Sequence, residues 1–198
     1  GFEGNGIFVA SNDNDIQCNI IGLTQDGQNP APNGEDGILV NNSAGNQIGG
    51  KHIADRNIVA ANGGNGISIL TGSPEEEESA LVLAADEPDD DELPVSPAKD
   101  NSILGNYIGT NAAGTVDRGN DGNGVQIAGS GVDELGELVN SQLNIVGEPG
   151  YGNLIAGNAA NGVALLEGAS DNFVSDNVIG LNVIGSVALP NDLAGVLI

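Results

Sequence analysis

The sequence predicts an all-β solenoid in which short coils of three strands stack on one another. Short strand-like segments recur in a fixed order along the chain, and glycine or asparagine stands at the turns between them. With 32 glycines and only five aromatic residues among 198, the chain has few large side chains for an ordinary globular core. Yet 39% of its residues are apolar, which argues against disorder.

The first recurring element reads Gly-apolar-any-apolar and predicts a short strand with alternate residues facing a core. It begins at Gly6, Gly37, Gly66, Gly124, Gly162 and Gly195. The second element reads Asn-any-Ile/Val or close to it, at Asn14, Asn46, Asn101, Asn144 and Asn172. The third has the same form, at Asn19, Asn57, Asn106, Asn153 and Asn177. We therefore expect about five three-strand coils plus a terminal strand.

Two types of coil alternate. In the first, third and fifth coils the second and third strands are almost fused. A loop of 15 residues follows, which starts at Gly22, Gly109 or Gly180 and ends just before Gly37, Gly124 or Gly195. In the second and fourth coils the loop lies between the second and third strands instead. The structural repeat is therefore a pair of coils.

Stacking buries the inner face that a single coil leaves open, because each strand pairs in parallel with its equivalents about 4.8 Å away. Equivalent inward positions, such as Ile48, Ile103 and Val146, then form columns of like residues. The strand-opening asparagines are expected to form ladders at two corners, because their amides can both donate and accept. At the third corner glycine follows Asn5, Asp36, Asn65, Asn123 and Asn161.

Three segments of this sequence resemble the right-handed parallel β-helix repeats of large bacterial surface and secreted proteins, a fold shared with the pectin-lyase-like superfamily. They are residues 101–110, 46–50 and 56–67. The resemblance implies a right-handed parallel β-helix over residues 1–198 as a single domain, apart from two insertions. It implies little about function, because this fold carries enzymes, adhesins and inert stalks alike.

The two insertions, 71–100 and 130–142, lie at one corner of neighbouring coils, and the larger is strongly acidic. Its acidic residues Asp89, Asp90, Asp91 and Glu92 are candidate ligands for Ca²⁺, which binds several oxygen atoms. No recognisable calcium loop is present, so a solvated loop is the alternative. Apart from this ion, no cofactor is expected.

On the third strand the outward positions are all apolar or aromatic: Ile20, Ile58, Tyr107, Leu154 and Val178. We call them the outward row. A row of this length is expected to be covered. A neighbouring subunit or another part of a longer parent protein would make it an interface. The alternatives are cover by the chain's own insertion or loops, and plain exposure to solvent.

Catalysis is not expected. The outward strand positions carry one acid, Asp15, and no Lys or Arg. The single His52 and the single Cys18 have no partner in the pattern that would make a general base or an activated nucleophile. A net charge of −24 argues against nucleic acid as a partner, and no apolar run approaches the roughly 18 residues of a membrane span.

The sequence starts in the approach to a first strand and stops in another, without a recognisable cap. We expect Phe2, Ile7, Val196 and Ile198 to be interface residues at the two ends of the solenoid, in head-to-tail assembly with copies of the chain or with the rest of a longer parent. The expected function is that of a structural element of an extracellular or cell-surface fibre. The alternative is a carbohydrate-binding adhesin or a non-catalytic segment of a polysaccharide-degrading enzyme.

Overall fold

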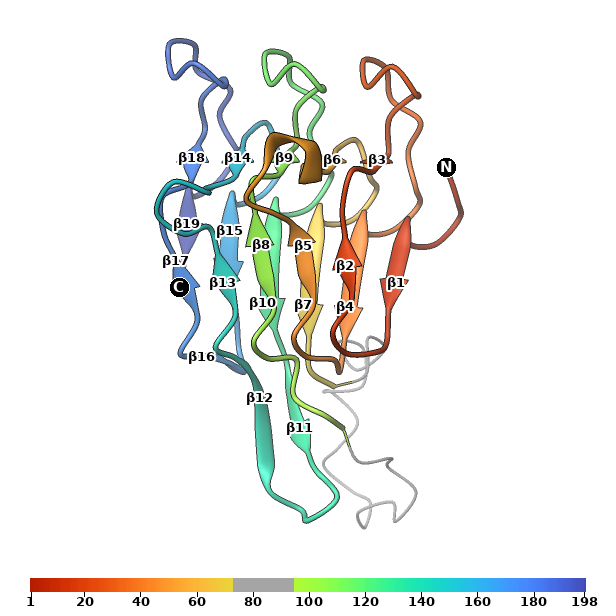
Figure 1. Cartoon of the computed structure of the whole chain (residues 1–198), viewed down its shortest axis with the longest axis vertical. Helices are drawn as coiled ribbons and strands as arrows, with labels where there is room; N and C mark the ends of the chain where they lie inside the picture. Colours follow the sequence, from red (N-terminus) through yellow and green to blue (C-terminus); the bar gives the residue numbers. More distant parts are fainter. Residues whose placement is uncertain (73–94) are drawn as a thin grey trace.

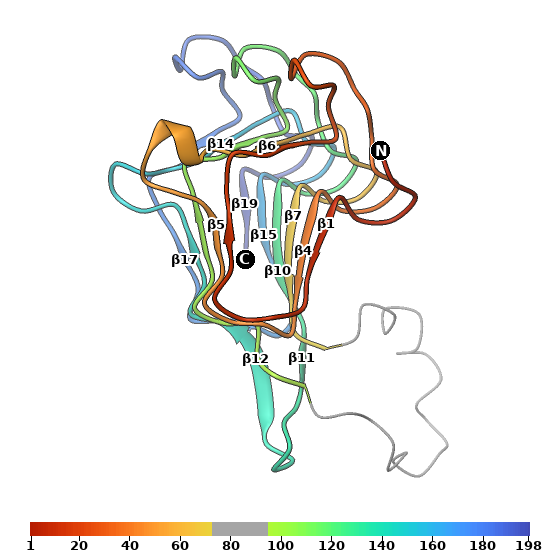
Figure 2. The ribbon, with the colours of Figure 1, turned by 45° about the vertical axis from the view of Figure 1, so that its right-hand side comes forward.

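The structure is a computed structural model that describes residues 1–72 and 95–198. These residues form a parallel β-solenoid, as predicted (Figure 1). Three parallel sheets run along the stack of coils, with six, five and five strands. The solenoid is seen nearly end-on in Figure 2, where the three sheets enclose the core.

Each sheet collects one of the three recurring elements. The first sheet contains β1 (Ile7–Val9), β4 (Ile38–Asn41), β7 (Ile67–Leu70), β10 (Val125–Ala128), β15 (Val163–Leu165) and β19 (Val196–Leu197). The second contains β2 (Asp15–Ile16), β5 (Gln47–Gly49), β8 (Ser102–Leu104), β13 (Ile145–Val146) and β17 (Phe173–Val174). The third contains β3 (Ile20–Ile21), β6 (Ile58–Val59), β9 (Tyr107–Ile108), β14 (Leu154–Ile155) and β18 (Val178–Ile179).

The register confirms the predicted columns of inward residues. Ile103 pairs with Ile48 on one side and with Val146 on the other, and all three side chains are fully buried. Full burial of an Ile or Val side chain contributes about 1.5–3 kcal/mol, so the columns are the main source of stability. The end coils are less protected: Ile7, Val174 and Ile179 are only partly buried.

The asparagine ladders at the two predicted corners are confirmed. At the corner before the second sheet, Asn46 donates its Nδ2 to Oδ1 of Asn101 at 3.0 Å, and Asn101 donates to Asn144 at 2.9 Å. At the corner before the third sheet, Asn57 donates to Asn106 at 3.0 Å and Asn106 donates to Asn153 at 3.1 Å. These amides also bond to carbonyls of neighbouring strands, so their burial leaves few unsatisfied groups.

A left-handed backbone conformation precedes most of these asparagines and turns the chain at the corner. The residues before Asn19, Asn106 and Asn177 have φ of 61°, 68° and 58°, although only one of them is glycine. Cys18 and Asp176 are the two that are not glycine, so Cys18 adopts a left-handed conformation that turns the chain at this corner.

A third ladder, absent from the sequence prediction, follows the third sheet. It joins Asn33, Asn62, Asn120, Asn158 and Asn191 through four amide bonds of 2.8 Å each. Each of these residues stands four positions before the glycine that opens a first strand. This spacing is constant in the sequence and would have been sufficient to predict the ladder.

The loops of the two coil types lie at different corners, as expected. The three 15-residue loops project side by side from one edge of the solenoid (Figure 1). They are linked by backbone hydrogen bonds, from Ala112 to Gly27 and from Val183 to Gly114. In the second coil the loop between the second and third sheets contains a short 3-10 helix, η1 (Ile53–Asp55). No helix among the described residues is long and apolar enough to cross a membrane.

Residues 130–142 form an antiparallel hairpin of β11 (Ser130–Val132) and β12 (Leu138–Gln142), which extends away from the sheets (Figure 2). Its base is anchored to the next coil by β16 (Ala169–Ser170). Val95 donates to the carbonyl of Val132 and so lies beside the hairpin. Most of the larger insertion lies outside the described residues, including the candidate Ca²⁺ ligands Asp89, Asp90, Asp91 and Glu92.

Candidate functional site

The outward row on the third sheet is covered by the chain itself at its centre. Ile58, Tyr107 and Leu154 have exposed fractions of only 7%, 9% and 4%. The expectation that these three residues form an interface with a neighbouring subunit is therefore wrong. The outer members, Ile20 and Val178, remain about 40% exposed.

The cover comes from the 15-residue loops. Leu23 in the first loop is buried in one cluster with Ile58, Tyr107 and Leu154, and Ala112 in the second loop packs against that cluster. Each loop is closed on itself by an antiparallel β-bridge, and the first of these joins Leu23 to Pro30. The alternative in which the chain's own loops cover the row thus holds for its centre.

Arg56 supplies further cover from the second coil. Its guanidinium carbon lies 3.8 Å from the centroid of the Tyr107 ring, and its Nε donates to the Gly105 carbonyl at 2.9 Å. Both contacts hold the side chain against the sheet. Arg56 is thus engaged in packing against the third sheet.

The remaining residues that were expected at interfaces belong to opposite ends of the stack, with β1 at one end and β19 at the other (Figure 1). Phe2 and Ile7 line a cavity of about 300 Å³ at the first coil, together with Ile20, Ile21 and Leu23. At the other end Val196 is 39% exposed and Ile198 is 92% exposed. Each end thus presents an apolar surface of the kind that a further coil would bury.

A groove of about 930 Å³ runs over the outer face of the first sheet. Phe8 and Leu39 contribute apolar surface to it, whereas Ser68, Gln126 and Glu167 contribute polar groups. Its floor is joined by hydrogen bonds, since Asn123 donates to Gln126 at 2.9 Å and Asn65 donates to Ser68 at 3.1 Å.

Asp36 lies in this groove and is the one acid in the column of asparagines that precede the first-strand glycines. Its Oδ1 accepts the backbone N–H of Asn65 at 2.6 Å, so it replaces an asparagine as an acceptor. Burial raises the pKa of the Asp36 carboxyl above its ordinary value of 3.8, and hydrogen bonds from Ser68 and Asn65 only partly oppose the rise.

The Asp36→Asn variant is therefore expected to be more stable than the parent at neutral pH, by about 1 kcal/mol. The folded-state pKa of Asp36 is raised, so its contribution to stability is full below pH 3.8 and is lost as pH rises through the folded-state pKa. Denaturant unfolding from pH 3 to pH 7 should give a stability difference between variant and parent that grows over this window. The exposed Asp121→Asn change is the control for net charge, and an equal gain there would contradict the assignment.

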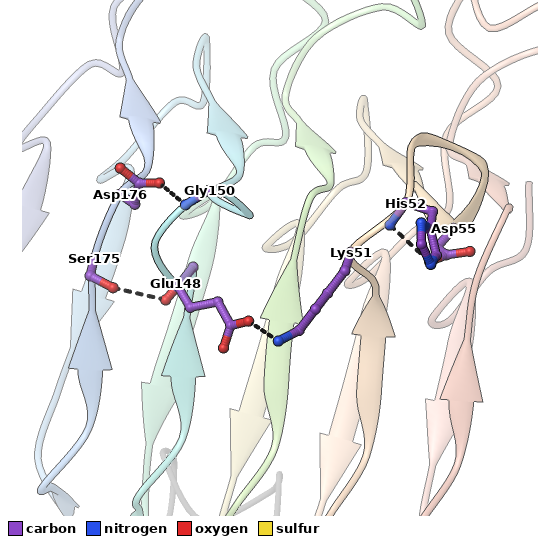
Figure 3. Close-up of polar contacts among 8 residues, drawn as sticks. Lys51, His52, Asp55, Glu148, Gly150, Ser175 and Asp176 are labelled. Atoms are coloured by element: carbon purple, nitrogen blue, oxygen red, sulfur yellow. Dashed lines mark hydrogen bonds and ion pairs between the residues drawn. The ribbon is translucent and has the colours of Figure 1, made fainter.

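The corner between the second and third sheets carries a chain of polar contacts across three coils (Figure 3). Lys51 in the second coil forms an ion pair with Glu148 in the fourth, and this contact raises the pKa of Lys51. Gly150 then donates its backbone N–H to Asp176 in the fifth coil. These contacts connect loops of the second, fourth and fifth coils on the surface of the solenoid.

Among residues 1–72 and 95–198 no group of three or more His, Cys, Asp or Glu residues is placed to hold a metal ion. His52 is exposed, with its backbone N–H bonded to Asp55, and Cys18 is an exposed free thiol in its turn. The described part of the chain thus offers a groove, two open ends and a regular scaffold.

Comparisons with known proteins add no assignment: no family model, no curated protein and no solved structure matches this chain.

Proposed function

We propose that this chain is a structural β-solenoid element of an extracellular or cell-surface fibre, in which solenoids stack head to tail. The observation that carries the proposal is the common direction of the three longest asparagine ladders, although the short ladder through Asn65, Asn123 and Asn161 runs the opposite way. In each of the three longest ladders, the side-chain amide donates from one coil to the next coil along the chain. A stack built in this way has a donor end and an acceptor end.

The two ends are complementary in hydrogen bonding. At the first coil, Oδ1 of Asn14 and of Asn19 has no donor among the described residues. At the fifth coil, the backbone N–H groups of Asn172 and Asn177 have no acceptor among them. A neighbour in the same orientation would match donors to acceptors, whereas a head-to-head neighbour would place carbonyl oxygens against each other.

The sheet edges fit the same arrangement. The first sheet has a sixth strand, β19, while the second and third sheets end at β17 and β18. A further coil stacked on this end, from a copy of the chain or from a longer parent, would place its strands beside β17 and β18. Such pairing is heterologous, and it extends without closing when the neighbour is stacked in the same direction.

The net charge of −24 opposes association of copies, because like charges repel across the contact. Salt screens this repulsion, with a Debye length of about 10 Å at 0.1 M. Assembly by apolar burial and backbone pairing is therefore expected to strengthen as salt is added.

Electron microscopy of the purified chain at low and high salt tests the proposal. We expect filaments that lengthen with salt, and we expect the β19 variant Val196→Lys to abolish them because it places a charge in the contact. Leu135→Lys is the matched control, since Leu135 is 84% exposed at the hairpin tip, away from the sheets. A chain that stays dispersed at high concentration and high salt would refute assembly. Binding of soluble polysaccharide by that dispersed chain would instead favour the carbohydrate-binding alternative, with the groove as its site.

A further inference from the structure

Six asparagines of this chain are directly followed by glycine: Asn5, Asn33, Asn62, Asn65, Asn123 and Asn161. We infer that these pairs are latent deamidation sites, which the stacked coils keep unreactive and which unfolding releases. All six lie within the described residues, and all six stand at the corner between the third and first sheets.

Deamidation at such a pair needs only the chain and water. The backbone nitrogen of the glycine loses its proton and attacks Cγ of the asparagine side chain. A bond from nitrogen to Cγ forms, the bond from Cγ to the side-chain nitrogen breaks, and ammonia leaves with the proton. Water then opens the cyclic imide to give aspartate or isoaspartate. Glycine favours the reaction because it has no side chain to hinder the attack.

The fold holds the attacking nitrogen in every pair. Each of the six glycine N–H groups donates to a backbone carbonyl of a neighbouring segment, at 2.8 or 2.9 Å: Gly6 to Asp36, Gly34 to Phe2, Gly63 to Asn33, Gly66 to Asn123, Gly124 to Asn161 and Gly162 to Ala194. A nitrogen whose proton is committed to a hydrogen bond is a poor nucleophile. The glycine nitrogen must first break its backbone hydrogen bond, which lies in the first sheet or in the segment that leads into it.

The ladders hold the other reactant, the side-chain amide. Asn62 donates its Nδ2 to Asn120 and accepts from Asn33, both at 2.8 Å. Asn161 donates to Asn123 at 2.9 Å, and Asn123 donates to Asn65 at 3.1 Å. Rotation of Cγ towards the following nitrogen would break these bonds in a buried environment, which is costly.

The six sites are not equally protected. Asn62 is 1% exposed and Asn161 is 7% exposed. Asn5, in the first coil, is only partly buried, and its Nδ2 bonds to the exposed carboxylate of Glu35. We therefore expect Asn5 to react first in the folded protein and Asn62 to react last.

The product would not fit the solenoid. Aspartate at position 62 would put a carboxylate in a buried site and lose the donor to Asn120, and isoaspartate would also lengthen the backbone by one atom within a fixed register. Asp36 illustrates the cost of such a group, because burial already raises the pKa of its carboxyl. A chain that stays unfolded long enough to react should thus lose the ability to refold.

Peptide mapping by mass spectrometry tests this inference. The folded protein and short synthetic peptides that span each pair are incubated together in mildly alkaline buffer, and the loss of each amide is followed over time. We expect Asn62 and Asn123 to react at least about ten-fold more slowly in the folded protein than in their peptides, since each reaction must wait for a local opening. Equal rates in protein and peptide would overturn the inference.

A variant separates ladder protection from general burial. Asn120→Ala removes the Oδ1 that accepts from Asn62, so the rate at Asn62 should rise several-fold while Asn123, in a different ladder, keeps its rate as an internal reference. Circular dichroism establishes whether the variant is folded. An unchanged rate at Asn62 in the folded variant would contradict the role of the ladder, and the comparison with peptides stands whether or not the variant folds.

Discussion

Replacing Ile103 with aspartate is expected to cost more than about 3 kcal/mol of unfolding free energy or to abolish folding. Ile103 is fully buried on β8 and pairs with Ile48 and Val146, so the carboxylate would enter the centre of the core column without a partner. Urea unfolding followed by circular dichroism measures the loss.

Ser102→Asp provides the control on the same strand. Ser102 faces outward and pairs with Gln47 and Ile145, so a carboxylate there stays in contact with water. We expect a change within about 0.5 kcal/mol. Similar damage from both substitutions would mean that the inward and outward faces of β8 are wrongly assigned.

The Asn106→Leu variant is expected to lose about 3 kcal/mol or more, although leucine is close in size to asparagine. The Asn106 side chain accepts from the backbone and side chain of Asn57, and it donates to Asn153 and to the carbonyl of Ile48. Its removal strands several buried groups at once, each at a cost of about 1–3 kcal/mol that repacking only partly offsets. Thermal unfolding by calorimetry should show the loss as a lower Tm.

Asn29→Leu is the matched control, because Asn29 is exposed in the first 15-residue loop. Its hydrogen bonds to Thr24 are made by its backbone, so the substitution leaves them in place. We expect its Tm to stay close to that of the parent. If Asn106→Leu were as mild as Asn29→Leu, the ladders would be incidental to stability and the core columns alone would hold the solenoid.

The order of the strands and their register could be predicted from the sequence. A residue such as Ile103 shows its inward orientation through the two-residue period of its own strand, and the matching residues Ile48 and Val146 follow from the repeat. The ladders through Asn46 and Asn57 followed for the same reason, since parallel stacking places equivalent residues next to each other.

The fate of the outward row could not be predicted from the same signals. Alternation along a strand shows which side chains point away from the core. Tyr107 and Leu154 point away from it but are buried by loops, and the path of a loop leaves no periodic pattern in the strand sequence. Only the packing of Leu23 and Ala112 against the third sheet determines that they are not a surface.

The sequence by itself therefore determined the solenoid, its three sheets and two of its ladders, because stacking repeats a local pattern at a fixed spacing. The tertiary structure alone decided the direction in which the amides donate, the protection of the six Asn-Gly pairs and the raised pKa of Asp36. These properties depend on which donor meets which acceptor across coils that are separated by 24 to 58 residues, and on how much water is excluded there. The residue pattern of a single coil specifies neither the pairing of donors with acceptors nor the exclusion of water.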